Sequence, residues 1–202
     1  MKKFLIIALV VIVILGIVAY VYVMNPFNVG IDPLRVATRQ YETGKRLEIS
    51  FTYSKQRLIA SSQYAFWIED MSGRYIDTVY VTQWTAQGGY NTRPHSIPKW
   101  VSAANPSTMS QDRIDAISGA TPRPGNYIVI WDFTDKNGNA ATGSQYRFYF
   151  EGTMNNDDTV LYSGIINISG ESWELLPDPV YSIEDSNYKD MLSNVKVAFF
   201  PR

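Results

Sequence analysis

Apolar and polar side chains alternate along much of this chain, and this period of two restricts the chain to a β fold. Residues 46–54 (RLEISFTYS) place Leu47, Ile49, Phe51 and Tyr53 on one face. A strand directs successive side chains to opposite faces, whereas a helical pattern repeats every 3.6 residues. Six further segments are predicted to be strands: residues 64–70, 75–83, 126–134, 145–151, 159–169 and 194–200.

Seven or eight strands separated by turn signals favour an antiparallel sandwich. The predicted fold is therefore an all-β, antiparallel immunoglobulin-like β-sandwich with one N-terminal transmembrane helix. Residues 71–74 (MSGR) and 135–139 (DKNGN) are each predicted to close a hairpin between the strands that flank them. Trp67 and Trp131, on strands, are assigned to the core. Outside the N-terminal segment, helical periodicity is confined to residues 186–192.

The long stretch between residues 84 and 121 does not fit the strand pattern. Segments of this length are usually functional or contain short helices of their own. Trp84 and Trp100 bracket the stretch and are expected to line a surface groove, and His95 lies between them. We therefore treat these three residues as a possible partner-binding loop. Because His95 is flanked by Pro94 and Pro98 and no G-x-S-x-G motif is present, we expect it to be structural or merely exposed.

The N-terminal segment, residues 4–24 (FLIIALVVIVILGIVAYVYVM), contains no charged residue. As a helix it is roughly 30 Å long, which matches the hydrocarbon core of a bilayer. A cleaved signal peptide is the alternative, but its apolar region is usually only about 7–15 residues long. We expect an uncleaved, single-pass signal anchor in the cell membrane. Residues 1–3 are then cytoplasmic, 25–33 form a tether, and 34–202 form an extracytoplasmic domain.

The composition excludes several classes of function. With 18 basic and 19 acidic residues, the chain is not expected to bind nucleic acid, which requires a basic face. Without cysteine there is no disulfide, thiolate nucleophile or cysteine-based metal site. Asp132 and Asp135 precede Asn137-Gly138 in a loop that is similar to calcium loops, but a plain turn is favoured because the calcium spacing is incomplete. No catalytic residue and no metal ligand is predicted, so we expect no enzyme activity.

The stretch 115–127 (DAISGATPRPGNY) presents two hydroxyl groups between small residues. Ser118, Gly119 and Ala120 allow another group to approach the backbone closely, and Pro122 forces Thr121 into an extended or turn conformation. Thr121 is expected on a short, stiff, exposed loop. The stretch is therefore either a turn that leads into the next strand or a place where a modifying enzyme reaches a hydroxyl.

Residues 64–169, and above all the pattern SGATPRPG-x-Y-x-x-x-W-D-x-x-D-x-x-G, resemble an uncharacterised family of predicted periplasmic, sandwich-like domains. The resemblance implies an extracytoplasmic location and a sandwich fold. It also implies gene neighbours that include flavin transferases and membrane redox proteins, which would be the envelope partners. After Glu151 this chain reads Gly-Thr-Met-Asn-Asn, whereas that family has an Arg-Glu-His-Gly run.

The segment from Asp115 through Ser118 and Gly119 to Thr121 (DAISGAT) is similar to the covalent FMN attachment motif of extracytoplasmic FMN-binding domains. That resemblance implies a phosphoester between FMN and Thr121. The sequence that follows, Pro-Arg-Pro-Gly, departs from those domains. Two functions are therefore expected: a membrane-anchored, non-catalytic binding or scaffolding module, and, as the alternative, an electron carrier with FMN on Thr121.

Overall fold

The structure is a computed structural model that describes residues 34–35, 44–55, 62–121 and 123–201. The chain divides into two compact units, Met1–Asp32 and Pro33–Arg202, and all described residues belong to the second. The predicted anchor (4–24) and the whole tether (25–33) thus lie outside the described residues. Within the described ranges, no helix combines the length and the apolar character needed to cross a membrane.

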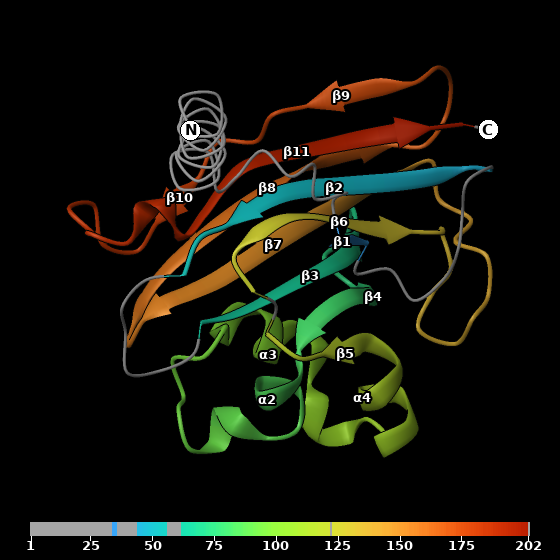
Figure 1. Ribbon diagram of the computed structural model, residues 1–202. Coiled ribbons are helices and arrows are strands. Elements are labelled where there is room, and N and C mark those ends of the chain that lie inside the picture. Colours follow the sequence, from blue (N-terminus) through green and yellow to red (C-terminus); the bar gives the residue numbers. More distant parts are fainter. Residues whose placement is uncertain (1–33, 36–43, 56–61, 122, 202) are drawn as a thin grey trace, which may run out of the picture. The chain divides into compact units, whose positions relative to one another are not determined.

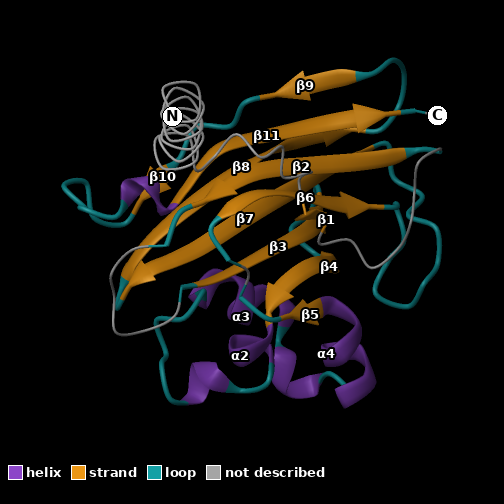
Figure 2. Ribbon diagram, viewed as in Figure 1, coloured by secondary structure: helices purple, strands orange, loops and turns teal. Residues whose placement is uncertain are grey.

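Two sheets form the body of the domain (Figures 1 and 2). The first sheet has five strands in the order β1 (Leu34–Arg35), β6 (Gly125–Trp131), β2 (Arg46–Tyr53), β11 (Leu192–Phe200) and β9 (Trp173–Leu175). The second has six, in the order β10 (Val180–Tyr181), β8 (Asp158–Asn167), β7 (Gln145–Asn155), β3 (Gln63–Asp70), β4 (Tyr75–Thr82) and β5 (Ser118–Gly119). The prediction of a mostly β, sandwich-like fold is confirmed.

The main core lies between the two sheets and follows the alternation in the sequence. In β2, the four predicted side chains Leu47, Ile49, Phe51 and Tyr53 are all buried, while the residues between them are partly exposed. Burial of apolar area on this scale is the dominant stabilising contribution to a domain of this size. Trp131 on β6 lies in this core, as the sequence predicts.

A layer of short helices covers part of the outer face of the second sheet, beside β3, β4 and β5 (Figure 2), and we call residues 83–117 the helical layer. It contains α2 (Gln83–Ala86), η1 (Gly89–Asn91), α3 (Pro98–Ala104), η2 (Pro106–Thr108) and α4 (Gln111–Ile117). A second apolar core joins this layer to β3 and β4, with Trp67 and Val81 packed against Trp100, Ile114 and Ile117. Trp67 is therefore buried as predicted, but under helices and not between the sheets.

The fold differs from the prediction in its chain connections. Strands β6 and β7 were expected to pair as a hairpin, but β6 pairs with β2 and β7 pairs with β3 and β8, so the connection crosses from one sheet to the other. The predicted turn at residues 135–139 is present, but the residues on either side of it form only one isolated antiparallel β-bridge, between Thr134 and Ala140. Two short parallel pairs, β1–β6 and β4–β5, also depart from a fully antiparallel sandwich.

Two other local predictions can be compared with the structure. The β3–β4 hairpin is confirmed, with Gly73 at φ 84° and the Asp70 carboxylate accepting hydrogen bonds from the backbone of Ser72 and Arg74. The predicted helix over residues 186–192 is wrong. Only η3 (Lys189–Met191) is helical there, because Leu192 already begins β11, where it pairs with Tyr53.

Candidate functional site

Polar side chains of β7 hold the start of helix α3. The buried Glu151 carboxylate accepts hydrogen bonds from the backbone nitrogens of Lys99 (3.2 Å) and Trp100 (2.9 Å). Two residues further along the strand, Thr153 Oγ1 accepts a hydrogen bond from Ile97 N (2.8 Å) and donates one to the His95 carbonyl (2.9 Å). These bonds satisfy backbone groups that a helix leaves free at its first turn.

Burial raises the pKa of Glu151 to about 7. The two backbone N–H groups and the charge of Lys99 act in the opposite direction, but removal of the carboxylate from water outweighs them. Glu151 therefore titrates near neutral pH while it is packed beneath a helix.

A second buried polar cluster attaches helix α2. Thr85 Oγ1 is hydrogen-bonded to Gln63 Oε1 (3.0 Å) on β3 and to Ser96 Oγ (2.6 Å). All three residues are fully buried. Because an unsatisfied buried polar group costs about 1–3 kcal/mol, such a cluster fixes one arrangement of the segments that share it. The helical layer is thus held on the sheet by specific polar bonds as well as by the second core.

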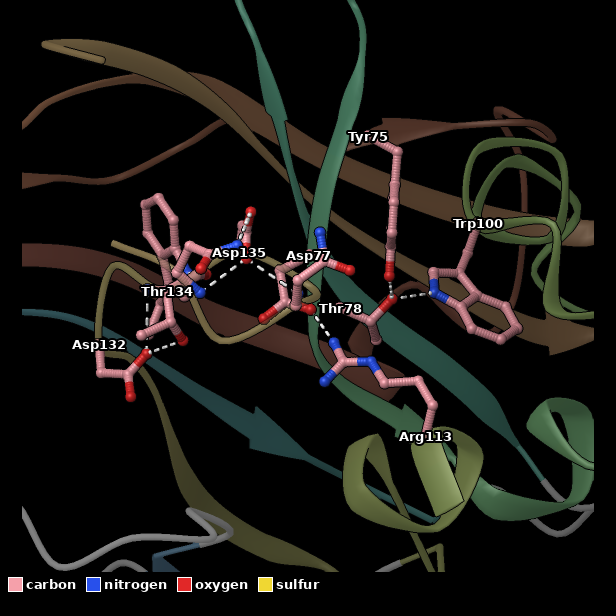
Figure 3. Close-up of polar contacts among 11 residues, drawn as sticks. Tyr75, Asp77, Thr78, Trp100, Arg113, Asp132, Thr134 and Asp135 are labelled. Carbon is pink, nitrogen blue, oxygen red and sulfur yellow. Dashed lines mark hydrogen bonds and ion pairs between the residues drawn. The ribbon is translucent and has the colours of Figure 1, made fainter. Parts of the chain in front are cut away.

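A third set of contacts links β4 to α3 and α4 (Figure 3). The Trp100 indole nitrogen donates to Thr78 Oγ1 (2.9 Å), and the Tyr75 hydroxyl shares a 2.6 Å hydrogen bond with the same oxygen. Trp100 is fully buried. The expectation that Trp100 lines a surface groove is therefore wrong, because its ring fills the core under the helical layer and its N–H finds an internal partner.

An ion pair joins β4 to helix α4, where the Arg113 guanidinium donates through Nη2 to the carboxylate of Asp77. Burial raises the pKa of Asp77 to about 6, against the attraction of Arg113, and the charges of Asp132 and Asp135 act in the same direction as burial. Neither Asp77 nor Arg113 is among the candidate residues that the sequence predicted.

A pocket of about 270 Å³ opens beside this ion pair, and we call it the Arg113 pocket. Its walls come from β4, the helical layer and the β6–β7 connection. They include Tyr75, Thr108, Met109, Arg113, Lys136 and Asn137. The Lys136 ammonium lies 6.0 Å from the centre of the Tyr75 ring. The pocket therefore combines an aromatic wall with two cationic side chains.

Trp84 lies on the outer surface of the helical layer with 42% of its surface exposed, and the groove expected beside it stays a prediction. The Arg93 guanidinium lies 5.8 Å from its ring centre. A Cβ atom at position 89 would lie 2.5 Å from the Trp84 ring, so only Gly89 allows the chain to pass this close. His95 is exposed too. Of the three loop residues, Trp84 and His95 are at the surface and Trp100 is not.

The stretch that contains Ser118 and Thr121 differs from the predicted loop. Asp115 is an exposed residue of helix α4, and its carboxylate accepts a hydrogen bond from Gln111 Nε2 (2.8 Å). Ser118 and Gly119 form β5, which pairs in parallel with Val81 and Thr82 at the edge of the second sheet. The stretch is therefore a helix-to-strand junction, with an irregular segment only after Gly119.

Gly119 packs closely against another residue of the same domain, Tyr80. A Cβ atom there would lie 3.0 Å from the Tyr80 ring, and the Tyr80 hydroxyl donates to the Ala120 carbonyl (3.0 Å). Thr121 is half-buried, and its hydroxyl points to the Ser62 carbonyl at 3.4 Å. Thr121 was expected on a short, stiff, exposed loop, and in the structure its own side chain is half-buried. Contact with the Tyr80 ring accounts for the small residue at position 119. Ser118 Oγ is buried without a hydrogen-bond partner among the described residues.

The acidic loop before β7 is a turn in the structure. Asp135 Oδ1 accepts hydrogen bonds from the backbone nitrogens of Asn137 (2.8 Å) and Asn139 (2.9 Å), while Asp132 Oδ1 accepts from Thr134 N (3.1 Å) and Oγ1 (2.6 Å). In the part of the chain that the structure describes, no group of three or more histidine, aspartate or glutamate side chains is placed to hold a metal ion.

The sequence contained one overlooked signal for these sites. Strand β7 carries Phe148 and Phe150 on one face and Tyr149, Glu151 and Thr153 on the other. Partly polar side chains on the second face of a central strand indicate that another layer covers that face. The helical layer, and the residues that hold it, follow from this pattern.

These features define the chain as a mostly β, two-sheet domain with a helical layer on one face. The chain belongs to the family described as predicted periplasmic protein (DUF2271), whose model matches residues 46–175. The predicted resemblance to an uncharacterised periplasmic family is thereby confirmed, and that description names no catalytic activity. No curated protein and no solved structure matches the chain.

Proposed function

We propose that this protein is an extracytoplasmic, non-catalytic binding or scaffolding module that contacts an envelope partner through its helical layer. In this proposal, residues 4–24 anchor it in the membrane and the two sheets serve as an immunoglobulin-like support. The periplasmic description of the family supports the location. A membrane redox protein or a flavin transferase is the class of partner that the sequence resemblance favours.

The contact between the exposed Trp84 and the half-buried Arg93 carries this proposal. Trp84 is 42% exposed, and Arg93 lies against its ring at 5.8 Å. Tryptophan and arginine are the residues most enriched at the energetic centres of protein interfaces. The exposed part of the Trp84 ring is an aromatic surface that a partner can cover.

The buried polar bonds beneath the helical layer add a second argument. Glu151 and Thr153 hold the backbone at the start of α3, and the Thr85 side chain links α2 to Gln63 of β3. A surface that is already ordered loses less conformational entropy when it binds, so it binds more tightly for the same contacts. The helical layer therefore has the rigidity expected of a recognition surface.

The test compares Trp84→Ala with Met71→Ala in the host organism. Met71, at the tip of the β3–β4 hairpin, is exposed to a similar extent (41%) and lies outside the helical layer. On native gels of solubilised membranes, the wild-type protein and Met71→Ala are expected to migrate as one larger complex, and Trp84→Ala as the free protein. Equal migration of all three proteins would count against the helical layer as the binding surface.

A covalently flavinylated electron carrier is the second candidate. Thr121 follows the edge strand β5, and the side of β5 away from β4 pairs with no other described strand. A modifying enzyme can approach an edge more readily than the centre of a sheet. If FMN is esterified to Thr121, the flavin supplies the redox chemistry, while Tyr80 and Gly119 fix the backbone that carries it.

Co-expression with a flavin transferase tests this candidate. A carrier would give a fluorescent band in a denaturing gel and a mass increase of one FMN phosphoester. Thr121→Ala should abolish both signals, and Ser118→Ala should weaken them less. Gly119→Val is a poor control, because its side chain would meet the Tyr80 ring. An unmodified wild-type protein in the presence of its own genome's transferase would remove this candidate.

A further inference from the structure

We infer that the Arg113 pocket binds the anionic group of a small ligand, with Arg113 and Lys136 as the residues that recognise the charge. The pocket lies between β4, α4 and the β6–β7 connection, and Trp84 is not among its lining residues. The inference does not rest on the proposed binding surface around Trp84, so each of them can fail without the other.

Arg113 supplies the first reason. Its Nη2 donates to Asp77, but its Nε is buried and makes no hydrogen bond to any described residue. Because Nε is buried, only the other N–H groups of the guanidinium can meet a ligand in the pocket. A guanidinium with one side held by a carboxylate is a rigid donor, and such a donor suits a second anion at its accessible N–H groups.

Lys136 supplies the second reason. No described carboxylate lies within 4.0 Å of its ammonium group, whereas the charge of Arg113 is balanced by Asp77. Its backbone nitrogen donates to the Ile76 carbonyl (2.9 Å), which fixes its position beside β4. The neighbouring Asp135 carboxylate is turned to the backbone of Asn137 and Asn139. Lys136 is therefore the cation of the pocket whose ammonium group no described carboxylate contacts.

The remaining walls indicate what the anion is attached to. The Tyr75 ring and Met109 offer apolar surface, while Thr108, Ser110 and Asn137 offer hydrogen-bonding groups. Ligand pockets typically measure about 300–1,000 Å³, so a pocket of about 270 Å³ suits a small molecule. An acidic monosaccharide or another small ring-bearing acid has this combination of charge, hydroxyl groups and size. A phosphate group would provide the same anionic chemistry.

The experiment is isothermal titration calorimetry of the full chain in detergent with three probes: D-glucuronate, inorganic phosphate and neutral D-glucose. We expect at least one anion to bind, with an affinity that falls as salt is added, and D-glucose to give no binding heat. Lys136→Gln should weaken binding by about tenfold, the usual effect of losing one hydrogen bond to a charged group. Binding of phosphate alone would assign the pocket to a phosphate-bearing ligand.

Lys196→Gln is the matched control because it removes the same charge from the first sheet, where Lys196 pairs with Glu174 (3.0 Å). It should leave anion binding unchanged. Arg113→Gln is avoided, because it would leave the buried Asp77 without its partner and unfold the site. The inference is overturned if neither anion binds, if D-glucose binds as tightly as glucuronate, or if Lys136→Gln and Lys196→Gln weaken binding equally.

Discussion

Glu151 is a buried carboxylate that the fold keeps close to its titration point at neutral pH. Two backbone N–H groups at the start of α3 stabilise its charge, but burial has the larger effect and raises its pKa to about 7. The folded protein therefore binds a proton more tightly than the unfolded chain does. A residue of this kind makes the stability of the domain depend on the pH of the compartment around it.

The expected pH dependence has a definite sign. Because the pKa of Glu151 is raised from 4.5 to about 7, its contribution to stability is greatest below pH 4.5 and is lost as the pH rises toward 7. Asp77, raised from 3.8 to about 6, acts in the same direction. Chemical denaturation at pH 5 and pH 8 should show a lower free energy of unfolding at pH 8. Glu151→Gln should reduce that difference, and Glu174→Gln, at an exposed ion pair, should not.

The turn at Gly138 gives a second prediction at the scale of one residue. Gly138 has φ +82°, and a Cβ atom there would meet nothing within 4 Å, so only backbone strain opposes a side chain. Gly138→Val is expected to destabilise the domain by about 1 kcal/mol or more, as measured by thermal unfolding. EDTA should leave the melting temperature unchanged. A drop that calcium reverses would instead assign Asp132 and Asp135 to a metal.

Among the elements, the strands were predictable from the sequence and their partners were not. The alternation in residues 46–54 depends only on which face is buried, and β2 begins at the predicted residue. The partner of residues 126–134 depends on where the chain goes after the turn. Both a hairpin and a crossing between sheets satisfy the same period of two, so the pattern cannot distinguish them. The alternation therefore predicted the sheet content but not the β6–β7 crossing.

The helical layer was missed for a related reason. Helices α2, α3 and α4 have only 4, 7 and 7 residues, too few for a 3.6-residue period to stand out. They are held by bonds from the sheet, such as those of Glu151 and Thr153, and not by their own propensity. The same contacts explain why Trp100 is buried, although it lies in a stretch that looks like a loop.

Thr153→Val tests whether the sheet holds helix α3. Valine has a similar shape but no hydroxyl, so Ile97 N and the His95 carbonyl would lose their partner. The loss should destabilise the domain by about 1–3 kcal/mol and speed hydrogen exchange in residues 97–104. Thr52→Val, at a partly exposed position on β2, is the control and should leave exchange in α3 unchanged. Equal exchange in both variants would contradict this account of α3.

At the scale of the whole molecule, the location of the domain follows from its family, and the anchor remains a prediction. Residues 4–24 have the length and composition of a membrane span. We expect the mature protein to retain Met1 and to sediment with membranes. A fragment from about residue 30 onward should fold by itself, because it contains both cores. Mass spectrometry that finds a soluble product beginning near residues 25–28 would contradict the anchor.

The proposed function depends most on contact between the helical layer and a partner through Trp84 and Arg93. Site-specific photo-crosslinking in living cells tests it most directly, with an aromatic photoreactive residue that keeps a ring at position 84 and, in a separate strain, the same residue at the similarly exposed position 71. The account predicts one discrete adduct at 84 that Arg93→Ala removes, and none at 71. Adducts at 71 but not at 84, or the same adducts at both positions, would contradict it.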